Sequence, residues 1–249
     1  KAGVVEALRR QLKTFTPAKA KRTEWGDGWV LMSFLTDCYT PAEATQRLTR
    51  QCLELLLDAG HKVRVQTRSA LVERDFDLLA AHKDRVRLGT SLPYLDDAVA
   101  RILEPRATGP TRRLKMLEQA AARGIPVYVA IAPVMPWTEP SELLNIAIWA
   151  GELRATEVFC EVLNPKGENL AGMERALRAG GRVDLAERVK SYDAGAWARA
   201  TAATLRLLAG GRAFVPWPDT GRAWAKHLPA DEFRWLGQFL PPSTGLQAA

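Results

Sequence analysis

The sequence predicts an α/β fold built on a parallel sheet, and two observations lead to this prediction. Short apolar segments typical of buried strands alternate with amphipathic segments typical of helices along the first part of the chain. The chain has 249 residues, of which 47% are hydrophobic, and this is enough to bury a sizeable core. Such an alternation builds either a barrel or a doubly wound sheet, and the periodicity alone leaves both open.

The expected strands are apolar runs bounded by turn residues. The first, 29–35, is nearly all apolar and is therefore expected to be buried on both faces. Four more strands are expected, at 62–67, 85–92, 125–134 and 156–163. Because helical segments connect these strands, each crossover should be right-handed.

The expected helices have one apolar side and recognisable ends. An amphipathic helix is expected at 1–14. Pro41 marks the start of the next helix and Gly60 marks its end, while Ser141 is expected to be an N-cap. The helices between the strands are expected at 42–59, 70–82, 94–103, 111–123 and 141–153.

After residue 163 the pattern changes from alternation to consecutive helices, which are expected at 168–179, 183–192 and 194–208. The tail from Phe214 onward is rich in aromatic residues and prolines. We expect it to be an irregular segment packed on the outside of the sheet. The sequence thus predicts two domains, an α/β domain over 1–166 and a helical and irregular C-terminal extension over 167–249.

The composition bears on compartment and partners. Cys38, Cys52 and Cys160 are far apart, which argues against a disulfide framework and suits a reducing cytoplasm. The sequence has no run of about eighteen apolar residues, so no membrane span is expected. The formal net charge of +7 is compatible with nucleic-acid binding, although a solvated arginine-rich surface is the stronger explanation of it.

Polar residues follow several expected strands, where parallel α/β proteins place their sites. These strand-end residues are Thr36, Asp37, Thr67, Arg68, Ser69, Thr90 and Ser91, with Glu161 in the last strand. Because the carboxyl ends of parallel strands meet at one edge, these side chains should gather there. The set suits a zwitterionic, hydroxyl-bearing ligand, with Arg for a carboxylate and Asp or Glu for an amine or a ribose.

Each of these residues also has a structural explanation. Asp37 could cap the helix after Pro41, and Arg68 could pair with Glu73 or Asp75. The sequence contains no hydrolase triad, P-loop or glycine-rich dinucleotide fingerprint.

The histidines and two of the cysteines have simpler explanations than a site. We expect solvated positions for the three histidines, His61, His82 and His227. Cys52 and Cys160 are expected to be core thiols, which leaves Cys38 as the one cysteine at the rim.

Several segments together resemble one known family. The segment TDCYTPAEATQRLTRQCLELL is similar to the Thr-Asp-Pro-Tyr-Gln-Pro-x-Glu and Leu-Thr-Arg segments of the DNA-repair-photolyase-like branch of the radical S-adenosylmethionine (SAM) superfamily. This branch includes spore photoproduct lyase. The chain contains further segments that resemble segments of the branch and follow one another in the same order as they do there. They are VQTRSALVERDFDLL, VRLGTSLPYLD, LEPRATGPTRRLKMLEQAAARGIPVYVAIAPVMP and EVLNPKG. The resemblance covers residues 1–167.

The resemblance implies a partial (β/α)₆ TIM-type barrel over 1–166. In that family a [4Fe-4S] cluster holds SAM by its amino and carboxylate groups. Reductive cleavage of SAM, with an electron from a donor such as flavodoxin or ferredoxin, then starts hydrogen abstraction from a substrate. The implied protein is a cytoplasmic radical SAM enzyme of the lyase or oxidoreductase type, and nucleic acid is a candidate substrate.

Site residues follow from the same resemblance. Thr36 and Asp37 match the strand end that faces the SAM amino group, and Arg68 matches a basic residue near its carboxylate. Ser91 matches a hydroxyl that contacts SAM, and Ala132 a backbone contact near the adenine. Thr67 joins this set as a hydroxyl of the same rim, and Asp37 and Cys38 are the candidates for a catalytic role.

The sequence departs from the family at its metal site. The family's CxxxCxxC motif is absent, so we expect no metal ligand in this chain, and without the motif it should be inactive as given. The first residue is Lys1 rather than Met, and the cluster ligands are expected upstream of it. Phe34 stands near the position of the hydrogen-donating cysteine of spore photoproduct lyase, which argues against that enzyme's repair mechanism.

Two alternatives remain open. One is a cluster-less barrel that binds a nucleotide or nucleic acid without redox chemistry. The other is an ordinary barrel lyase or aldolase, which would need a Lys or His at the rim.

Overall fold

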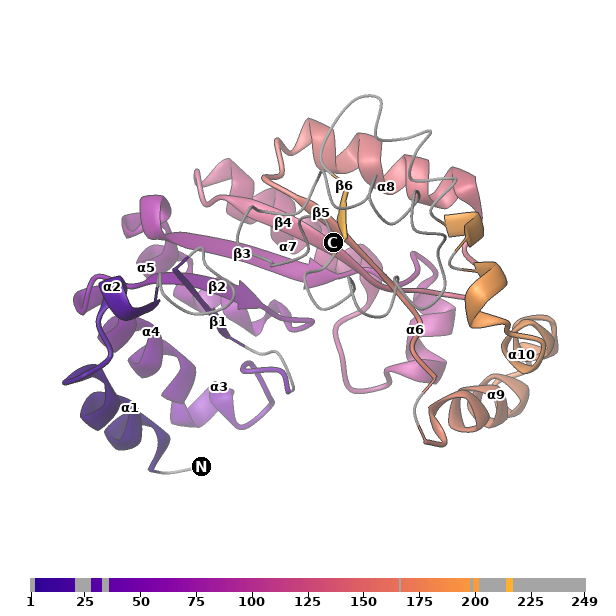
Figure 1. Cartoon of the computed structure of the whole chain (residues 1–249), viewed down its shortest axis with the longest axis horizontal. Helices are drawn as coiled ribbons and strands as arrows, with labels where there is room; N and C mark the ends of the chain where they lie inside the picture. Colours follow the sequence, from indigo (N-terminus) through magenta and orange to yellow (C-terminus); the bar gives the residue numbers. More distant parts are fainter. Residues whose placement is uncertain are drawn as a thin grey trace, which may run out of the picture. The chain divides into compact units, whose positions relative to one another are not determined.

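The computed structural model describes residues 3–20, 28–32, 36–165, 167–197, 199–201 and 214–216. Figure 1 shows helices alternating with strands along most of this length. Among the described residues the chain forms two compact units. The first comprises 3–90 and 112–128, and the second comprises 91–111 and 129–216. The predicted division at residue 166 stays a prediction.

Six strands form one sheet in the order β1-β2-β3-β4-β5-β6, which is also their order in the chain. They are β1 (Trp29–Met32), β2 (Lys62–Gln66), β3 (Val86–Ser91), β4 (Val127–Val134), β5 (Val158–Val162) and β6 (Phe214–Pro216). β1 pairs with β2, β2 with β3, β4 with β5 and β5 with β6, each time in parallel. A doubly wound sheet reverses its strand order at a switch point, whereas a barrel does not. The predicted fold class, α/β of the partial TIM-barrel type, is therefore confirmed.

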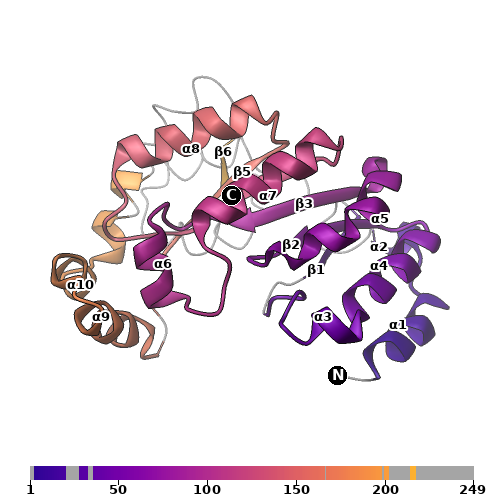
Figure 2. The same cartoon turned by 180° about the vertical axis from the view of Figure 1, so that it is seen from behind.

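In the first unit, helices cover the sheet. They are α1 (Val4–Leu12), α2 (Pro17–Ala20), α3 (Glu43–Gln46), α4 (Leu48–Asp58), α5 (Phe76–Ala81), most of α7 (Pro110–Ala122) and the 3₁₀ helices η1 (Ala70–Asp75) and η2 (Lys83–Arg85). Both views show α1, α3 and α4 on the same side of β1 and β2 (Figures 1 and 2).

The packing of α4 on β2 follows from the spacing of apolar residues. Leu53 and Leu57 recur one helical turn apart on α4 and are almost completely buried. Val63 and Val65 alternate along β2 on one face and are also fully buried. The helix ends before Gly60, whose φ of +81° suits glycine, as the sequence predicts.

β1 differs from its prediction. All four residues of Trp29–Met32 are only partly buried, whereas the sequence predicts a strand buried on both faces. The reason is its place at one end of the strand order, where only β2 pairs with it among the described residues. The predicted strand end at 33–35 lies outside the described residues.

His61 also corrects an expectation. Its side chain is fully buried rather than solvated, and it stacks on Phe15 with ring centroids 5.2 Å apart. Its Nε2 lies 3.2 Å from the carbonyl oxygen of Phe15. The chain beyond α1 therefore covers this histidine, because α1 packs against α4, the helix that ends just before it. His82 is half-buried and His227 lies outside the described residues.

The second unit has its own apolar core. Its helices are α6 (Asp97–Leu103), α8 (Pro140–Glu152), α9 (Asn169–Ala179) and α10 (Val183–Lys190). Tyr94 and Trp137 pack with Leu177 and Val189, which come from α9 and α10. The predicted helices at 168–179 and 183–192 are confirmed. Residues 194–197 and 199–201 are helical as predicted, and 202–208 lies outside the described residues.

Two predictions in this unit are wrong. The N-cap of α8 is Glu139 rather than Ser141, because Pro140 occupies the first helical position that proline favours. Phe214–Pro216 forms β6 beside β5, so this part of the tail joins the sheet instead of packing outside it. The rest of the aromatic tail lies outside the described residues. Among the helices that the structure describes, none combines the length and hydrophobicity needed to cross a bilayer.

Gly89 allows a close contact inside the first unit. The ring of Tyr128 lies directly against the backbone of Gly89, where a Cβ atom would overlap it. Tyr128 is fully buried, and its hydroxyl donates a hydrogen bond of 3.3 Å to the carbonyl of Val65. Gly89→Ala should therefore lower the free energy of unfolding by about 1–3 kcal/mol, because the ring must move out of a packed core. Urea unfolding measures this loss.

Gly172 on α9 provides the control, since a Cβ atom there would meet nothing within 4 Å. Gly172→Ala should leave the protein as stable as the parent or more stable, by up to about 1 kcal/mol. Equal losses in the two variants would show that the Tyr128 contact is not what restricts position 89.

Candidate functional site

The site begins with the turn after β1, which holds Asp37. The Oδ1 atom of Asp37 accepts hydrogen bonds from the Thr67 hydroxyl at 2.7 Å and from the backbone N–H of Tyr39 at 2.8 Å. Its Oδ2 atom accepts from the backbone N–H of Arg68 at 2.7 Å. The half-buried carboxylate thus joins the turn after β1 to the end of β2.

The local sequence explains this arrangement. β1 and β2 are parallel and adjacent, with Met32 opposite Val65, so the segments that follow them leave the sheet side by side. An aspartate two residues before a backbone N–H readily forms a local turn, and Asp37 does so with Tyr39. The structural alternative for Asp37 was a helix cap. The next helix, α3, has Ala42 at its N-cap and no side-chain cap, so that alternative is wrong.

Thr67 connects the end of β2 to that of β3. Its side chain is buried, donates to Asp37 and accepts from the backbone N–H of Ser69 at 3.0 Å. Its own N–H donates to the carbonyl of Gly89, and its carbonyl accepts from the Thr90 hydroxyl at 2.7 Å. Asp37, Thr67 and Arg68, three of the residues singled out from the sequence, therefore form one hydrogen-bonded group.

The other predicted site residues lie at strand ends or next to this group. Thr36 is exposed immediately before Asp37. Ser91 is buried as the last residue of β3, and Ala132 is half-buried in β4. Both belong to the second unit, so their place in the site stays a prediction. Cys38 is half-buried, and its carbonyl accepts from the Thr49 hydroxyl at 2.7 Å.

The two carboxylates that the sequence offers as partners for Arg68, those of Glu73 and Asp75, are bound by other arginines. Glu73 is held by both terminal nitrogens of Arg112, at 2.5 and 2.6 Å. Asp75 accepts from Arg50 at 3.1 Å and contacts Arg74 at 3.5 Å. Arg68 is half-buried, and its backbone N–H bonds to Asp37.

A network that the sequence analysis missed lies behind the turn. Tyr39 is buried, and its hydroxyl donates to Oδ2 of Asp75 at 3.0 Å. Burial, followed by the charge of Asp75, raises the pKa of Tyr39 well above its usual value, so the phenol stays protonated and can donate. Arg50 also pairs with Asp77, and this bond lowers the pKa of Asp77 to about 2. The sequence feature that could have indicated this network is Tyr39, which lies inside the segment that resembles the family.

The three cysteines, all of which lie in the described part of the chain, do not suit a [4Fe-4S] cluster. Cys52 is buried on α4 and Cys160 on β5, as predicted for core thiols, and burial raises the pKa of both. A cluster needs several thiolates close together. Within the described ranges, no group of three or more His, Cys, Asp or Glu side chains could hold a metal ion.

Comparisons with known proteins give relatives in sequence and partial matches in structure. No family model matches it. It is 36% identical to the uncharacterized protein ORF301 of Acidianus two-tailed virus over 165 residues, 64% of this chain and 54% of that protein. It is 28% identical to the uncharacterized protein MJ0683 of Methanocaldococcus jannaschii over 56% of this chain and 52% of that protein.

It is also 28% identical to the uncharacterized protein Rv2578c of Mycobacterium tuberculosis, over 55% of this chain and 38% of that protein. The chain thus spans about half the length, or less, of these curated relatives.

Two solved structures of Streptococcus suis SuiB superpose in part. The one bound to S-adenosylmethionine matches with a TM-score of 0.40 at 14% identity, over 51% of this chain and 31% of that chain. The other matches with a TM-score of 0.45 at 12% identity, over 69% of this chain and 39% of that chain. These superpositions are too loose to support an argument about function.

The Thr67 hydroxyl gives a sharp test of the hydrogen-bonded group. Thr67→Val should lower the free energy of unfolding by about 1–3 kcal/mol, because Asp37 loses a donor and the Ser69 amide loses an acceptor inside the protein. Thr67→Ser keeps the hydroxyl and should recover most of this loss. Urea unfolding compares the two variants. Equal midpoints for valine and serine would contradict the role given to the hydroxyl.

Proposed function

We propose that this chain is the SAM-binding part of a radical SAM enzyme of the DNA-repair-photolyase-like branch. The observation that carries the proposal is the hydrogen-bonded group of Asp37, Thr67 and Arg68. The resemblance assigns the amino and carboxylate ends of SAM to these positions. In the structure they are adjacent and follow neighbouring parallel strands, where such folds bind ligands.

Each residue in the group has a defined task in this proposal. The guanidinium of Arg68 offers paired N–H donors that match the two oxygens of the SAM carboxylate. A carboxylate has about four acceptor positions, and Asp37 already uses three of them for Thr67, Tyr39 and Arg68. The remaining position is available to the SAM ammonium. Thr36 adds a hydroxyl from the same unit, and the SAM contacts of Ser91 and Ala132 are carried by the resemblance alone.

The proposal separates SAM binding from redox chemistry. The cysteines of this chain do not suit the cluster. We therefore assign the reductive cleavage of SAM to a polypeptide whose own thiolates hold the [4Fe-4S] cluster. Flavodoxin or ferredoxin would supply the electron, and the cytoplasm is the compartment in which such reduced partners occur. Cys38, next to Asp37 and half-buried, is proposed for a catalytic role together with Asp37.

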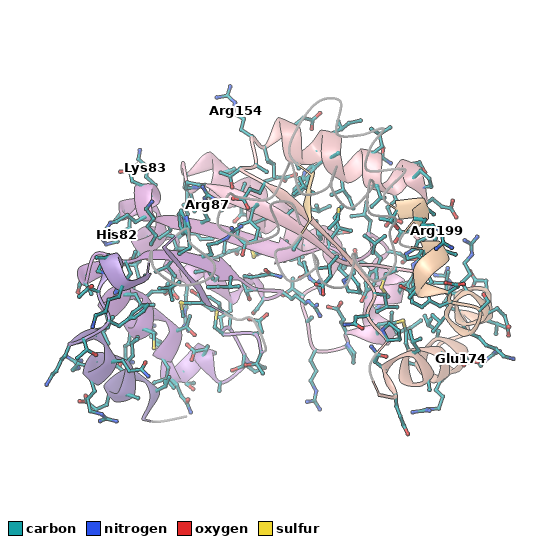
Figure 3. The ribbon with its side chains drawn as sticks, viewed as in Figure 1. His82, Lys83, Arg87, Arg154, Glu174 and Arg199 are labelled. Atoms are coloured by element: carbon teal, nitrogen blue, oxygen red, sulfur yellow. The ribbon has the colours of Figure 1, made fainter. Side chains whose placement is uncertain are left out.

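A second candidate function is nucleic-acid binding, either as the substrate of this enzyme or without redox chemistry. It is favoured by the net charge of +7 and by a cluster of cations around Trp29 at the amino ends of the first strands. Lys62 is opposite Trp29 in the register and lies 5.5 Å from its ring. The guanidinium of Arg87, labelled in Figure 3, lies 4.5 Å from the same ring. Aromatic rings beside cations suit bases and phosphates.

Arg68→Ala tests the main proposal. The variant should bind SAM about tenfold more weakly or worse, because the SAM carboxylate loses its charged partner. Isothermal titration calorimetry measures the affinity. Arg101→Ala, which removes an exposed charge on α6, is the control and should bind as the parent does. An Arg68→Ala variant with parental affinity would remove Arg68 from the site.

Salt dependence tests the second candidate. Affinity for a single-stranded oligonucleotide should fall steeply with salt, and Lys62→Ala should reduce the slope of log K against log salt by about 0.7 for each lost phosphate contact. Lys115→Ala removes another exposed lysine, on α7, and should leave the slope unchanged. A flat salt profile in the parent would remove the argument from charge.

A further inference from the structure

Tyr39 bonds to the candidate site through its backbone and to a buried ion-pair network through its side chain. Its backbone N–H donates to Asp37 at 2.8 Å, and its hydroxyl donates to Asp75 at 3.0 Å. The side chain is 2% exposed, so water does not compete for the hydroxyl. Tyr39 therefore connects Asp37 to Asp75 through a single residue.

Asp75, at the other end of this connection, is buried and bound by several partners. It is 1% exposed at the end of η1, the 3₁₀ helix that follows Arg68 after a single residue, Ser69. Arg50 holds its Oδ1 at 3.1 Å, and Arg74 contacts its Oδ2 at 3.5 Å. Arg50 in turn binds both oxygens of Asp77 at 2.8 Å. Loss of a partner from a buried, paired carboxylate is costly, which favours the arrangement seen here.

A second set of hydrogen bonds joins the same turn to α4. The Thr49 hydroxyl donates to the carbonyl of Cys38 at 2.7 Å, and the Thr49 N–H donates to Glu43 at 2.9 Å. Glu43 is buried and pairs with Arg74, which also donates to the Glu43 carbonyl. Arg74 thus contacts both Asp75 and Glu43, so the two connections share one arginine.

We propose that Tyr39 and Asp75 are positioning residues of the SAM site: they fix the turn on which Asp37 lies, and thereby its distance from Thr67 and Arg68. Neither residue needs to touch the ligand. The proposal rests on the function proposed above. Its first consequence, a fixed Asp37, does not depend on SAM.

Tyr39→Phe is the variant that tests positioning, because it removes one hydroxyl and no volume from the ring. Tyr128→Phe is a matched control in the same unit, since it removes a buried hydroxyl that donates to Val65 rather than to Asp75. In the ligand-free protein, exchange of the Tyr39 and Arg68 amides, measured by NMR, should become about tenfold faster in Tyr39→Phe only. Unchanged exchange, or equal acceleration in both variants, would overturn the proposal.

SAM affinity then tests whether positioning serves the site. Calorimetry should show binding weakened by roughly fivefold or more in Tyr39→Phe and unchanged in Tyr128→Phe. Asp75→Asn should act in the same direction. Faster amide exchange with parental SAM affinity would overturn the link to the site. If the parent does not bind SAM, the proposed function fails, while the exchange measurement still decides whether Tyr39 positions Asp37.

Discussion

The carboxylate of Asp37 is the interaction on which the candidate site depends. It accepts two backbone N–H groups and one hydroxyl, and these donors come from its own turn and from the end of the neighbouring strand. Hydrogen bonds to a charged acceptor are the strong ones, at about 1.5–3 kcal/mol each. Without this acceptor, the amides of Tyr39 and Arg68 would lose their partner at the end of the sheet. The same bonds occupy three of its acceptor positions, which leaves one for the ligand contact proposed above.

The buried charges behind the turn explain why Asp37 can serve as such an organiser. Arg50 and Arg74 neutralise the carboxylates of Glu43, Asp75 and Asp77, two of which are buried. Removing one member would leave a buried charge without compensation, which is costly. The bonds that hold the side chain of Tyr39 and the carbonyl of Cys38 therefore belong to a network that lies outside the contacts proposed for SAM.

Much of the fold could be predicted because it depends on local patterns. The apolar alternation in 62–66 and the helical spacing in 48–58 each specify an element that the structure contains. What could not be predicted depends on contacts between distant segments. His61 looks solvated until Phe15 covers it, and Asp75 looks like a partner of Arg68 until Tyr39, thirty-six residues earlier, reaches it. β6 is another such case, since three residues of an irregular-looking tail pair with β5.

In the candidate site, too, some residues could be predicted from local patterns and others could not. Asp37, Thr67 and Arg68 were found because parallel strands deliver their carboxyl ends to one edge, and the structure joins them by hydrogen bonds. The roles of Tyr39, Thr49 and Glu43 were not found, although all three lie in the segment that resembles the family. Sequence spacing identifies residues that reach an edge, whereas the residues that hold them in place become visible only through packing.

The most direct test of the account is an NMR titration of the isotope-labelled chain with SAM. The account predicts that the amide signals of Asp37, Tyr39, Arg68 and Ser69 shift together and saturate with one dissociation constant. Shifts confined to other parts of the chain, or no saturable shift at SAM concentrations of about 1 mM, a range that covers weak ligand binding, would contradict the claim that this strand edge binds SAM.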